Sequence, residues 1–358
     1  GGHYHQWLVA QGIDRDQVCG PDNALERYEG WPTQVYKTAL PEELHQKTYV
    51  TDRAIEQIEA AAAADEPFFL HVGYPDPHHP FAPPGDWYHR YEPGDVEVPT
   101  SFDDPHTASM PHVQALVERR GSPHPVFSPA MWAPTEEQLR EAMARELGSI
   151  AFIDHGVDRL LATLDRLGLA DDTIVVFTTD HGDMFGDHGL ILKAAIHYDA
   201  VIRTPLAISV PTSHRTEGAG PARTEALVSS LDLSATLLDL CLGTPAPYHG
   251  TEGRSLVGLL DGSSTDSRDE VLVEEDEMID LFGVGRPLRM RTLVTADGRL
   301  TVYDGMAQAE LFDRREDPDE LRNLWDDPAG RTLRAEMTER LVQALLRADD
   351  EPVPTHFA

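Results

Sequence analysis

The sequence has only two cysteines in 358 residues, Cys19 and Cys241, and no Cys-x-x-Cys pair. This scarcity supports neither a disulfide framework nor a zinc site built from thiolates. No apolar run approaches the roughly 18 residues that a membrane span needs. Lysine is also scarce, because only Lys37, Lys47 and Lys193 occur. At such a low frequency, each lysine is a candidate for a specific role.

Basic residues are too few to balance the acidic ones. The chain has 29 Lys and Arg against 62 Asp and Glu, a formal net charge of -33. Such a charge opposes binding to nucleic acid or to an anionic membrane surface. A small anionic substrate would have to be held by local positive charge. At this length the chain can bury a sizeable core.

Helical and strand-like segments alternate along the chain. Helical periodicity runs from Pro41 to Asp65 and over 135–168, where Thr135 and Gly168 are suitable end residues. Short apolar segments at 68–72, 173–178 and 206–210 read as buried strands. This alternation predicts an α/β fold with a largely parallel sheet and helices on both of its faces.

The texture of the sequence changes near residue 265. Two strand-like segments flank Ala-Asp-Gly298, which is a hairpin signal, and a helical pattern over 334–347 follows. We therefore predict a larger α/β domain at 1–265 and a C-terminal subdomain at 266–358, with an antiparallel hairpin and a closing helix.

Asp180 and His181 follow directly on the apolar segment 174–177, where a strand should end. Asp and Gly after a strand are ordinary turn formers, so Asp-His-Gly alone is a weak signal. The longer pattern is stronger, because several glycines shape the loop and ligands bind at the carboxyl ends of strands in open α/β sheets. A carboxylate beside an imidazole predicts a metal site, and Lys193 follows as a cation suited to an anionic substrate.

A second candidate loop, 74–84, is rich in proline and follows the segment 68–72. It carries His78 and His79, of which we single out His78. Together with the pair at 180–181 and Lys193, this loop indicates hydrolysis of a sulfate or phosphate ester. His197 and Arg203 either brace this site or form a structural salt bridge, and both readings stay open.

These motifs occur in an order that resembles the sulfatase family of the alkaline phosphatase superfamily. The resemblance spans roughly residues 45 to 345 and rests on Pro77-His-His-Pro-Phe81, Asp180-His-Gly182, Lys193, Arg203-Thr-Pro-Leu206, Gly253-Arg-Ser-Leu256, Leu311-Phe-Asp313 and Glu316-Asp-Pro-Asp-Glu-Leu-Arg-Asn-Leu324. It implies that residues 1–265 belong to a sulfatase-like catalytic domain.

The resemblance also implies residue roles. Asp180 and His181 match two of the ligands to one divalent cation, which is usually calcium in sulfatases. Lys193 matches the lysine that contacts the sulfate group, and His78 matches the histidine that contacts the sulfate or the leaving-group oxygen. The substrate would be a small anionic sulfate ester.

The sequence departs from the family pattern in two places. The family nucleophile is a formylglycine made in a Cys-x-Pro-Ser-Arg type motif near the N-terminus, and neither that motif nor the early Asp-Asp metal pair occurs here. Since the chain opens with Gly1-Gly2-His3 rather than Met or a signal peptide, we expect the N-terminal part of the domain, with its formylglycine, to be missing. We expect this chain alone to be inactive.

Two other functions remain as alternatives. A phosphonate or phosphate ester hydrolase of the same superfamily shares most of the site and would use Mn²⁺ or Zn²⁺. A non-catalytic, ligand-binding relative would never have had the nucleophile.

Overall fold

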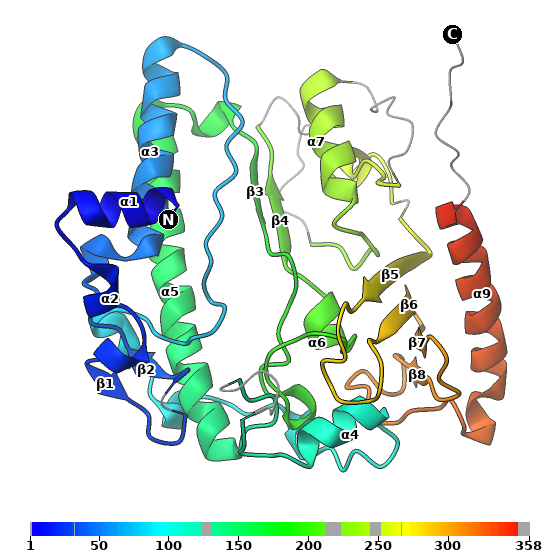
Figure 1. Cartoon of the computed structure of the whole chain (residues 1–358). Coiled ribbons are helices and arrows are strands. Elements are labelled where there is room, and N and C mark those ends of the chain that lie inside the picture. The colour runs from blue at the N-terminus through cyan, green and yellow to red at the C-terminus, as the bar shows by residue number, and fades with distance from the viewer. Residues whose placement is uncertain are drawn as a thin grey trace, which may run out of the picture. The chain divides into compact units, whose positions relative to one another are not determined.

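A computed structural model describes residues 2–31, 33–123, 130–211, 223–243, 252–265 and 267–349 (Figure 1). The chain forms two compact units, each assembled from separate stretches. The first unit contains Gly1–Phe102, Arg119–Thr173 and Phe185–Ile191, and the second contains Asp103–Glu118, Ile174–Met184 and Leu192–Ala358. The division predicted at residues 265 and 266 stays a prediction.

Two long helices dominate the first unit, α3 (Gln46–Ala64) and α5 (Glu136–Leu167), and they pack against each other (Figure 1). An ion pair of 2.6 Å joins Arg159 of α5 to Asp52 of α3. Such half-exposed pairs contribute only about 0–1 kcal/mol. Burial of apolar side chains such as Ile58, which is 4% exposed, contributes about 1.5–3 kcal/mol for each residue and therefore dominates the packing.

The ends of α5 confirm the predicted start and stop. The Thr135 side chain accepts a hydrogen bond from the Gln138 N–H, and the Gln138 side chain accepts one from the Thr135 N–H, which is a capping box. Gly168 ends the helix in the left-handed conformation, with φ 72°. In the described part of the chain, no helix, α5 included, is both long and apolar enough to cross a membrane.

The rest of the first unit consists of short elements and loops. They are α1 (His3–Ala10), α2 (Arg15–Val18), β1 (Glu26–Arg27) and β2 (Tyr36–Lys37). β1 and β2 pair antiparallel. Next to β2, Val35 forms an isolated parallel bridge with Phe81. This bridge anchors the chain three residues after His78.

The second unit contains two sheets and five α-helices among its described residues. In chain order its elements are α4 (Pro111–Val117), β3 (Val175–Thr178), α6 (Asp199–Ile202), β4 (Leu206–Ser209), α7 (Asp232–Leu242), α8 (Val257–Leu260), β5 (Glu270–Asp276), β6 (Arg289–Thr295), β7 (Gly298–Tyr303), β8 (Glu310–Asp313) and α9 (Arg331–Asp349). The strands β5 to β8 form one antiparallel sheet in that order. The predicted hairpin is observed as β6 and β7, and the closing helix as α9.

Both faces of the sheet β5–β8 are covered within the second unit. One face packs against α9 through an apolar cluster that includes Leu293, Leu300, Leu311 and Met337. Side chains alternate between faces along a strand, so Thr292 lies on the opposite face. That face carries buried polar groups, which must find hydrogen-bond partners, and it holds the segment that follows Lys193.

The prediction of a largely parallel sheet is not confirmed. β3 and β4, both predicted as buried strands, are only partly buried and pair antiparallel, with Val175 opposite Ser209 and Thr178 opposite Leu206. All five strand ladders among the described residues, which make up three sheets, are antiparallel. Apolar composition does not encode strand direction, which the path of the connecting chain decides.

The strand predicted at 68–72 is also absent. These residues form no ladder with any described strand, and Phe69 is 85% exposed. The segment has the composition of a buried strand but no partner strand among the described residues. An apolar segment cannot become a strand without hydrogen-bond partners for its backbone.

Candidate active site

The loop after β3 brings Asp180 and His181 together, as predicted. Oδ2 of Asp180 lies 3.6 Å from Nε2 of His181, and the Asp180 side chain is 83% exposed. The other oxygen, Oδ1, accepts hydrogen bonds from the Thr179 hydroxyl at 3.2 Å and from the His181 N–H at 3.0 Å. Local hydrogen bonds therefore hold one carboxylate oxygen and leave the other facing the imidazole.

Electrostatics keep Asp180 ionised. Partial burial raises the pKa of this carboxyl, but the neighbouring His181, the Thr179 hydroxyl and the backbone N–H groups outweigh it and lower the pKa below its usual value. On His181, Nδ1 lies 2.7 Å from the Gly182 carbonyl oxygen. Because a carbonyl only accepts, the Nδ1 N–H donates this bond, and in the neutral ring Nε2 presents its lone pair.

This pair fits two ligands of a divalent cation. An ionised carboxylate and an imidazole whose other nitrogen donates to a carbonyl are common metal-ligand types, and atoms 3.6 Å apart can bind the same ion. Among the described residues, no group of three or more His, Cys, Asp or Glu side chains is arranged to hold a metal. Asp180 and His181 therefore form a partial donor set.

Position 182 in this loop accepts only glycine, because the chain passes very close to the backbone of α6 there. Its N–H donates to the Val201 carbonyl at 2.7 Å. A Cβ at this position would collide with the carbonyl oxygen of Ala200 in α6. The chain thus passes close to the backbone of α6 directly after His181, and this contact constrains the path of the loop that carries Asp180 and His181.

Lys193 lies on a loop that is hydrogen bonded to the loop of Asp180. The N–H of Met184 donates to the Leu192 carbonyl at 3.0 Å, and the N–H of Leu192 donates to Oδ1 of Asp183 at 2.7 Å. Lys193 itself is partly buried. The structure therefore places three of the four predicted site residues on two adjoining loops of one unit.

His197 is buried, and its contacts tie the segment after Lys193 to the sheet. Its side chain is 3% exposed, with Nε2 2.8 Å from Oε2 of Glu275 and Nδ1 2.8 Å from the Thr292 hydroxyl. Arg203, in contrast, is 61% exposed and pairs with Asp199 at 3.4 Å. His197 thus ties the Lys193 segment to the sheet, and Arg203 makes a surface ion pair.

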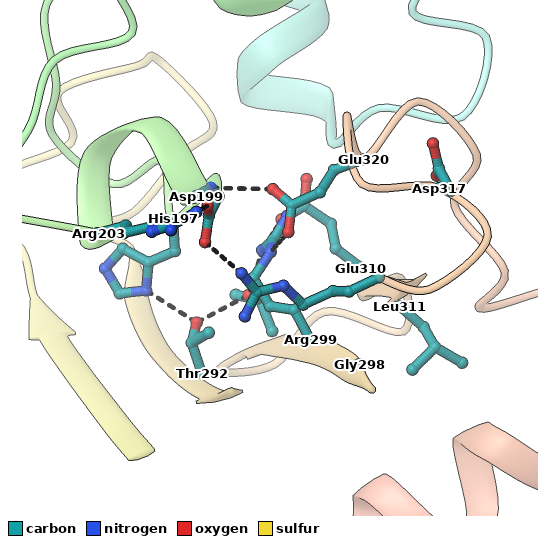
Figure 2. A network of polar contacts seen from close by, with 12 residues as sticks. His197, Asp199, Arg203, Thr292, Gly298, Arg299, Glu310, Leu311, Asp317 and Glu320 are labelled. Atoms are coloured by element: carbon teal, nitrogen blue, oxygen red, sulfur yellow. Dashed lines mark hydrogen bonds and ion pairs between the residues drawn. The ribbon is translucent and has the colours of Figure 1, made fainter. Parts of the chain in front are cut away.

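Figure 2 shows how the polar contacts continue beneath this segment. Thr292 and Thr301 share a hydrogen bond of 2.7 Å between their hydroxyls, and the buried Arg299 donates to Thr301 at 2.8 Å. Arg299 also pairs with Glu320 at 2.6 Å, and Glu320 accepts from the Asp199 N–H at 2.9 Å. The network joins the start of α6 to the C-terminal sheet.

His78 lies in the first unit, on the loop anchored by Phe81, whereas Asp180, His181 and Lys193 belong to the second. Its ring is exposed and stacks on His79, with centroids 4.1 Å apart, and its Nδ1 lies 2.7 Å from the His79 carbonyl oxygen. The approach of His78 to the other three residues stays a prediction.

Sequence reasoning missed three side chains that bond to the backbone on either side of Lys193: His112, Asp183 and Glu275. Asp183 follows the Asp-His-Gly motif and was noticed only as part of the loop. His112 and Glu275 lie far from Lys193 along the chain and belong to no motif. Only the packing of the second unit reveals them.

Comparison with known families decides the identity of the fold. The family model described as Sulfatase matches residues 2–244, more than half of the chain. This chain belongs to the sulfatase family. A second model, described as N-sulphoglucosamine sulphohydrolase, C-terminal, matches residues 186–347. The two models together cover both loops of the candidate site and the sheet β5–β8.

Individual relatives agree with this assignment. The chain is 31% identical over 332 residues to a multifunctional alkaline phosphatase superfamily protein of Trinickia caryophylli, covering 89% of this sulfatase-family chain and 62% of the relative. It is 29% identical over 276 residues to a choline-sulfatase of Rhizobium meliloti, covering 76% and 49%. The chain therefore spans about half to three fifths of the length of these curated relatives.

Solved structures show the same fold. A phosphonate monoester hydrolase from Silicibacter pomeroyi superposes with a TM-score of 0.79 and 26% identity, covering 97% of this chain and 69% of that one. A putative sulfatase from Bacteroides thetaiotaomicron superposes with a TM-score of 0.68 and 23% identity, covering 86% and 64%. The fold is thus α/β and alkaline phosphatase-like.

Proposed function

We propose that this protein acts in the hydrolysis of sulfate esters, with a small anionic sulfate ester as substrate. The observation that carries the proposal is the joining of the Asp180–His181 loop to the Lys193 loop by backbone and side-chain hydrogen bonds, inside the region matched by the sulfatase model. A carboxylate and an imidazole on one loop, with a lysine on the adjoining loop, are suited to binding an anionic group.

Asp180 and His181 would hold one divalent cation, which we propose to be Ca²⁺. When bound, such a cation stabilises negative charge on the group that is transferred. The ionised Asp180 and the exposed lone pair of His181 supply two ligands. Further ligands would have to come from groups outside this pair, since the described residues contain no larger donor cluster.

Lys193 and His78 would act on the ester itself. We propose that the ammonium group of Lys193 binds an oxygen of the sulfate group, because a fixed cation stabilises charge without reorganising. His78, whose ring is exposed, would donate a proton to the leaving-group oxygen as the bond to sulfur breaks. This second role requires His78 to approach Lys193.

The nucleophile is a separate proposal. In a sulfatase we expect a formylglycine made in a Cys-x-Pro-Ser-Arg type motif, and the printed sequence contains no such motif. We therefore propose that residues 1–358 alone bind metal and sulfate weakly and turn over sulfate esters little or not at all.

Calorimetric titration of residues 1–358 with CaCl₂ tests the metal assignment. Asp180→Asn and His181→Ala should each weaken Ca²⁺ binding on the order of tenfold or more, since even partners that only support a ligand contribute that much. Asp158→Asn is the matched control, because Asp158 is an exposed acid on α5. Equal affinity in all four proteins would contradict the assignment.

The alternative of a phosphonate or phosphate ester hydrolase is favoured by one observation, the 26% identity and TM-score of 0.79 with a phosphonate monoester hydrolase. That enzyme class would prefer Mn²⁺ or Zn²⁺. Parallel titrations with Ca²⁺, Mn²⁺ and Zn²⁺, and with inorganic sulfate and phosphate, separate the two. Tighter binding of phosphate with Mn²⁺ or Zn²⁺ would favour the alternative. Anion binding that persists without turnover when a formylglycine is provided would favour a ligand-binding relative.

A further inference from the structure

The backbone around Lys193 has a conformation that residues with side chains rarely adopt. Leu192, Ala194 and Ala195 have φ values of 73°, 83° and 37°, and none of them is glycine. Such a backbone conformation is strained in a residue with a side chain and persists only where its surroundings hold it. Neighbouring groups must therefore hold this segment in place.

On the N-terminal side of Lys193, the contacts come from the loop after β3. The Asp183 carboxylate accepts the Leu192 N–H at 2.7 Å, and the Leu192 carbonyl accepts the Met184 N–H at 3.0 Å. Both polar groups of Leu192 are thus bonded to residues directly downstream of Asp180 and His181.

On the C-terminal side, both polar groups of Ala195 are bonded to side chains. The Ala195 N–H donates to Oε1 of Glu275 at 2.9 Å, and its carbonyl oxygen lies 2.9 Å from Nε2 of His112. Since a carbonyl only accepts, Nε2 of His112 carries the proton. Glu275 comes from β5 and His112 from α4, so two further elements converge on this one residue.

These two side chains are themselves held. The other oxygen of Glu275 faces the buried His197, at 2.8 Å from its Nε2. His112 is fully buried and lies beside the rings of Phe282 and Tyr303, each with its centroid 5.4 Å away. The groups that hold Ala195 therefore have little freedom to move.

We propose that His112, Asp183 and Glu275 are positioning residues that hold the backbone on both sides of Lys193, so that its ammonium group is aimed at the anionic group of the substrate. The inference rests on the proposed function, in which Lys193 binds that group. It gives the C-terminal sheet a part in anion binding, because Glu275 reaches the site from β5.

The scarcity of lysine makes a direct test practical. Residues 1–358 labelled with ¹³C-lysine should give three groups of side-chain NMR signals, from Lys37, Lys47 and Lys193, and Lys193→Ala identifies one of them. Inorganic sulfate is then titrated into the wild type and into Glu275→Ala. Glu274→Ala is the matched control, because Glu274 neighbours Glu275 on β5 but pairs with Arg291 at 2.6 Å.

In Glu275→Ala we expect the Lys193 signals to shift or broaden, while those of Lys37 and Lys47 stay in place. The apparent Kd for sulfate should rise severalfold. In Lys193→Ala it should rise on the order of tenfold, the loss of one charge-assisted hydrogen bond. The Lys193→Ala/Glu275→Ala double variant should bind no more weakly than Lys193→Ala, because Glu275 acts through Lys193.

The two proposals fail in different ways. If the Lys193 signals of the wild type do not shift when sulfate is added, the proposed function is contradicted. Lys193 signals unchanged in Glu275→Ala, or additive losses in the double variant, would overturn the positioning role.

Hydrogen exchange gives a readout that needs no anion. The 192–197 amides should exchange faster in Glu275→Ala than in Glu274→Ala, and equal exchange would overturn the proposal. If Glu275→Ala does not fold, Glu275→Gln replaces it: its amide oxygen can still accept the Ala195 N–H, so protection there should be retained, and its loss would count against the proposed contact.

Discussion

Nζ of Lys47 lies 3.8 Å from Oδ2 of Asp76, two residues before His78, and the Lys47 side chain is only 1% exposed. Lys47 also donates to the Ser149 carbonyl at 3.1 Å. Burial lowers the pKa of Lys47 to about 8 and raises the pKa of Asp76, although each partner opposes the other's shift. Desolvation thus outweighs the attraction, and the pair connects α3 to the loop that carries His78.

Lys47→Met should destabilise the protein by about 3–5 kcal/mol near pH 8, because it leaves a buried carboxylate without its partner. The loss should shrink at acid pH, as Asp76, whose pKa burial raises, takes up a proton. Between pH 8 and pH 10.5 the unfolded wild type binds more protons at Lys47 than the folded state does. The free energy of unfolding of the wild type should therefore rise with pH over this range, whereas Lys47→Met should lack this rise. Urea unfolding at these pH values measures both effects. A loss independent of pH would contradict the role of Asp76.

Glu277→Gln should change how stability depends on pH. Burial, together with the neighbouring Glu275, raises the pKa of Glu277 to about 7. Glu275 in turn contacts His197 and interacts electrostatically with His112. Between pH 4.5 and 7 the folded state therefore binds more protons than the unfolded state, and this group's contribution is lost as the pH rises through 7. Gln stays neutral, so the variant should show a flatter profile over this range.

The matched control for this experiment is Glu274→Gln, on the exposed side of β5. It should leave the slope between pH 4.5 and 7 as it is in the wild type. If thermal melts give the same slope for wild type and Glu277→Gln, the raised pKa of Glu277 is wrong.

Gly182→Ala should disturb the loop that carries Asp180 and His181, because the added Cβ meets the Ala200 carbonyl oxygen. We expect a loss of about 1–3 kcal/mol, as for other overpacked sites, and weaker Ca²⁺ binding. Gly94→Ala is the control, since nothing lies within 4 Å of its Cβ position. Denaturant unfolding and calorimetry report the two effects. Equal behaviour of both variants would show that the loop tolerates a side chain.

Residues 1–358 assayed on 4-nitrophenyl sulfate with Ca²⁺ should show little or no turnover, because no formylglycine motif is present in them. The rate of nitrophenol release, followed by absorbance against a no-protein control, decides this. Ordinary sulfatase turnover would mean that another group in this chain serves as nucleophile.

Phe69→Ser should reduce self-association without loss of stability. Phe69 is 85% exposed, within an apolar segment that forms no ladder among the described residues, and such surface favours association. Light scattering and binding of a hydrophobic dye should both fall. Phe81→Ser, at a position only 2% exposed, should instead unfold the protein. Unchanged light scattering in Phe69→Ser would show that this segment does not drive self-association.

Local features of the fold were predictable because short-range chemistry decides them. The cap at Thr135 and the left-handed Gly168 bound α5 as expected, and the turn before Gly298 joins β6 to β7. These signals depend on residues a few positions apart. Strand direction does not, and for this reason the antiparallel pairing of β3 with β4 was missed.

By itself the sequence determined the site's chemistry: an ionisable pair, Asp180 and His181, directly after a strand, and one of three lysines close behind. Adjacent residues remain adjacent in any fold, so this pair could be read from the order of residues. Only the tertiary structure decided what holds Lys193. Glu275, which lies 80 positions from Ala195, reaches it because β5 lines the sheet face on which that segment rests. Contacts over such separations depend on how sheets and helices pack, and no local pattern encodes them.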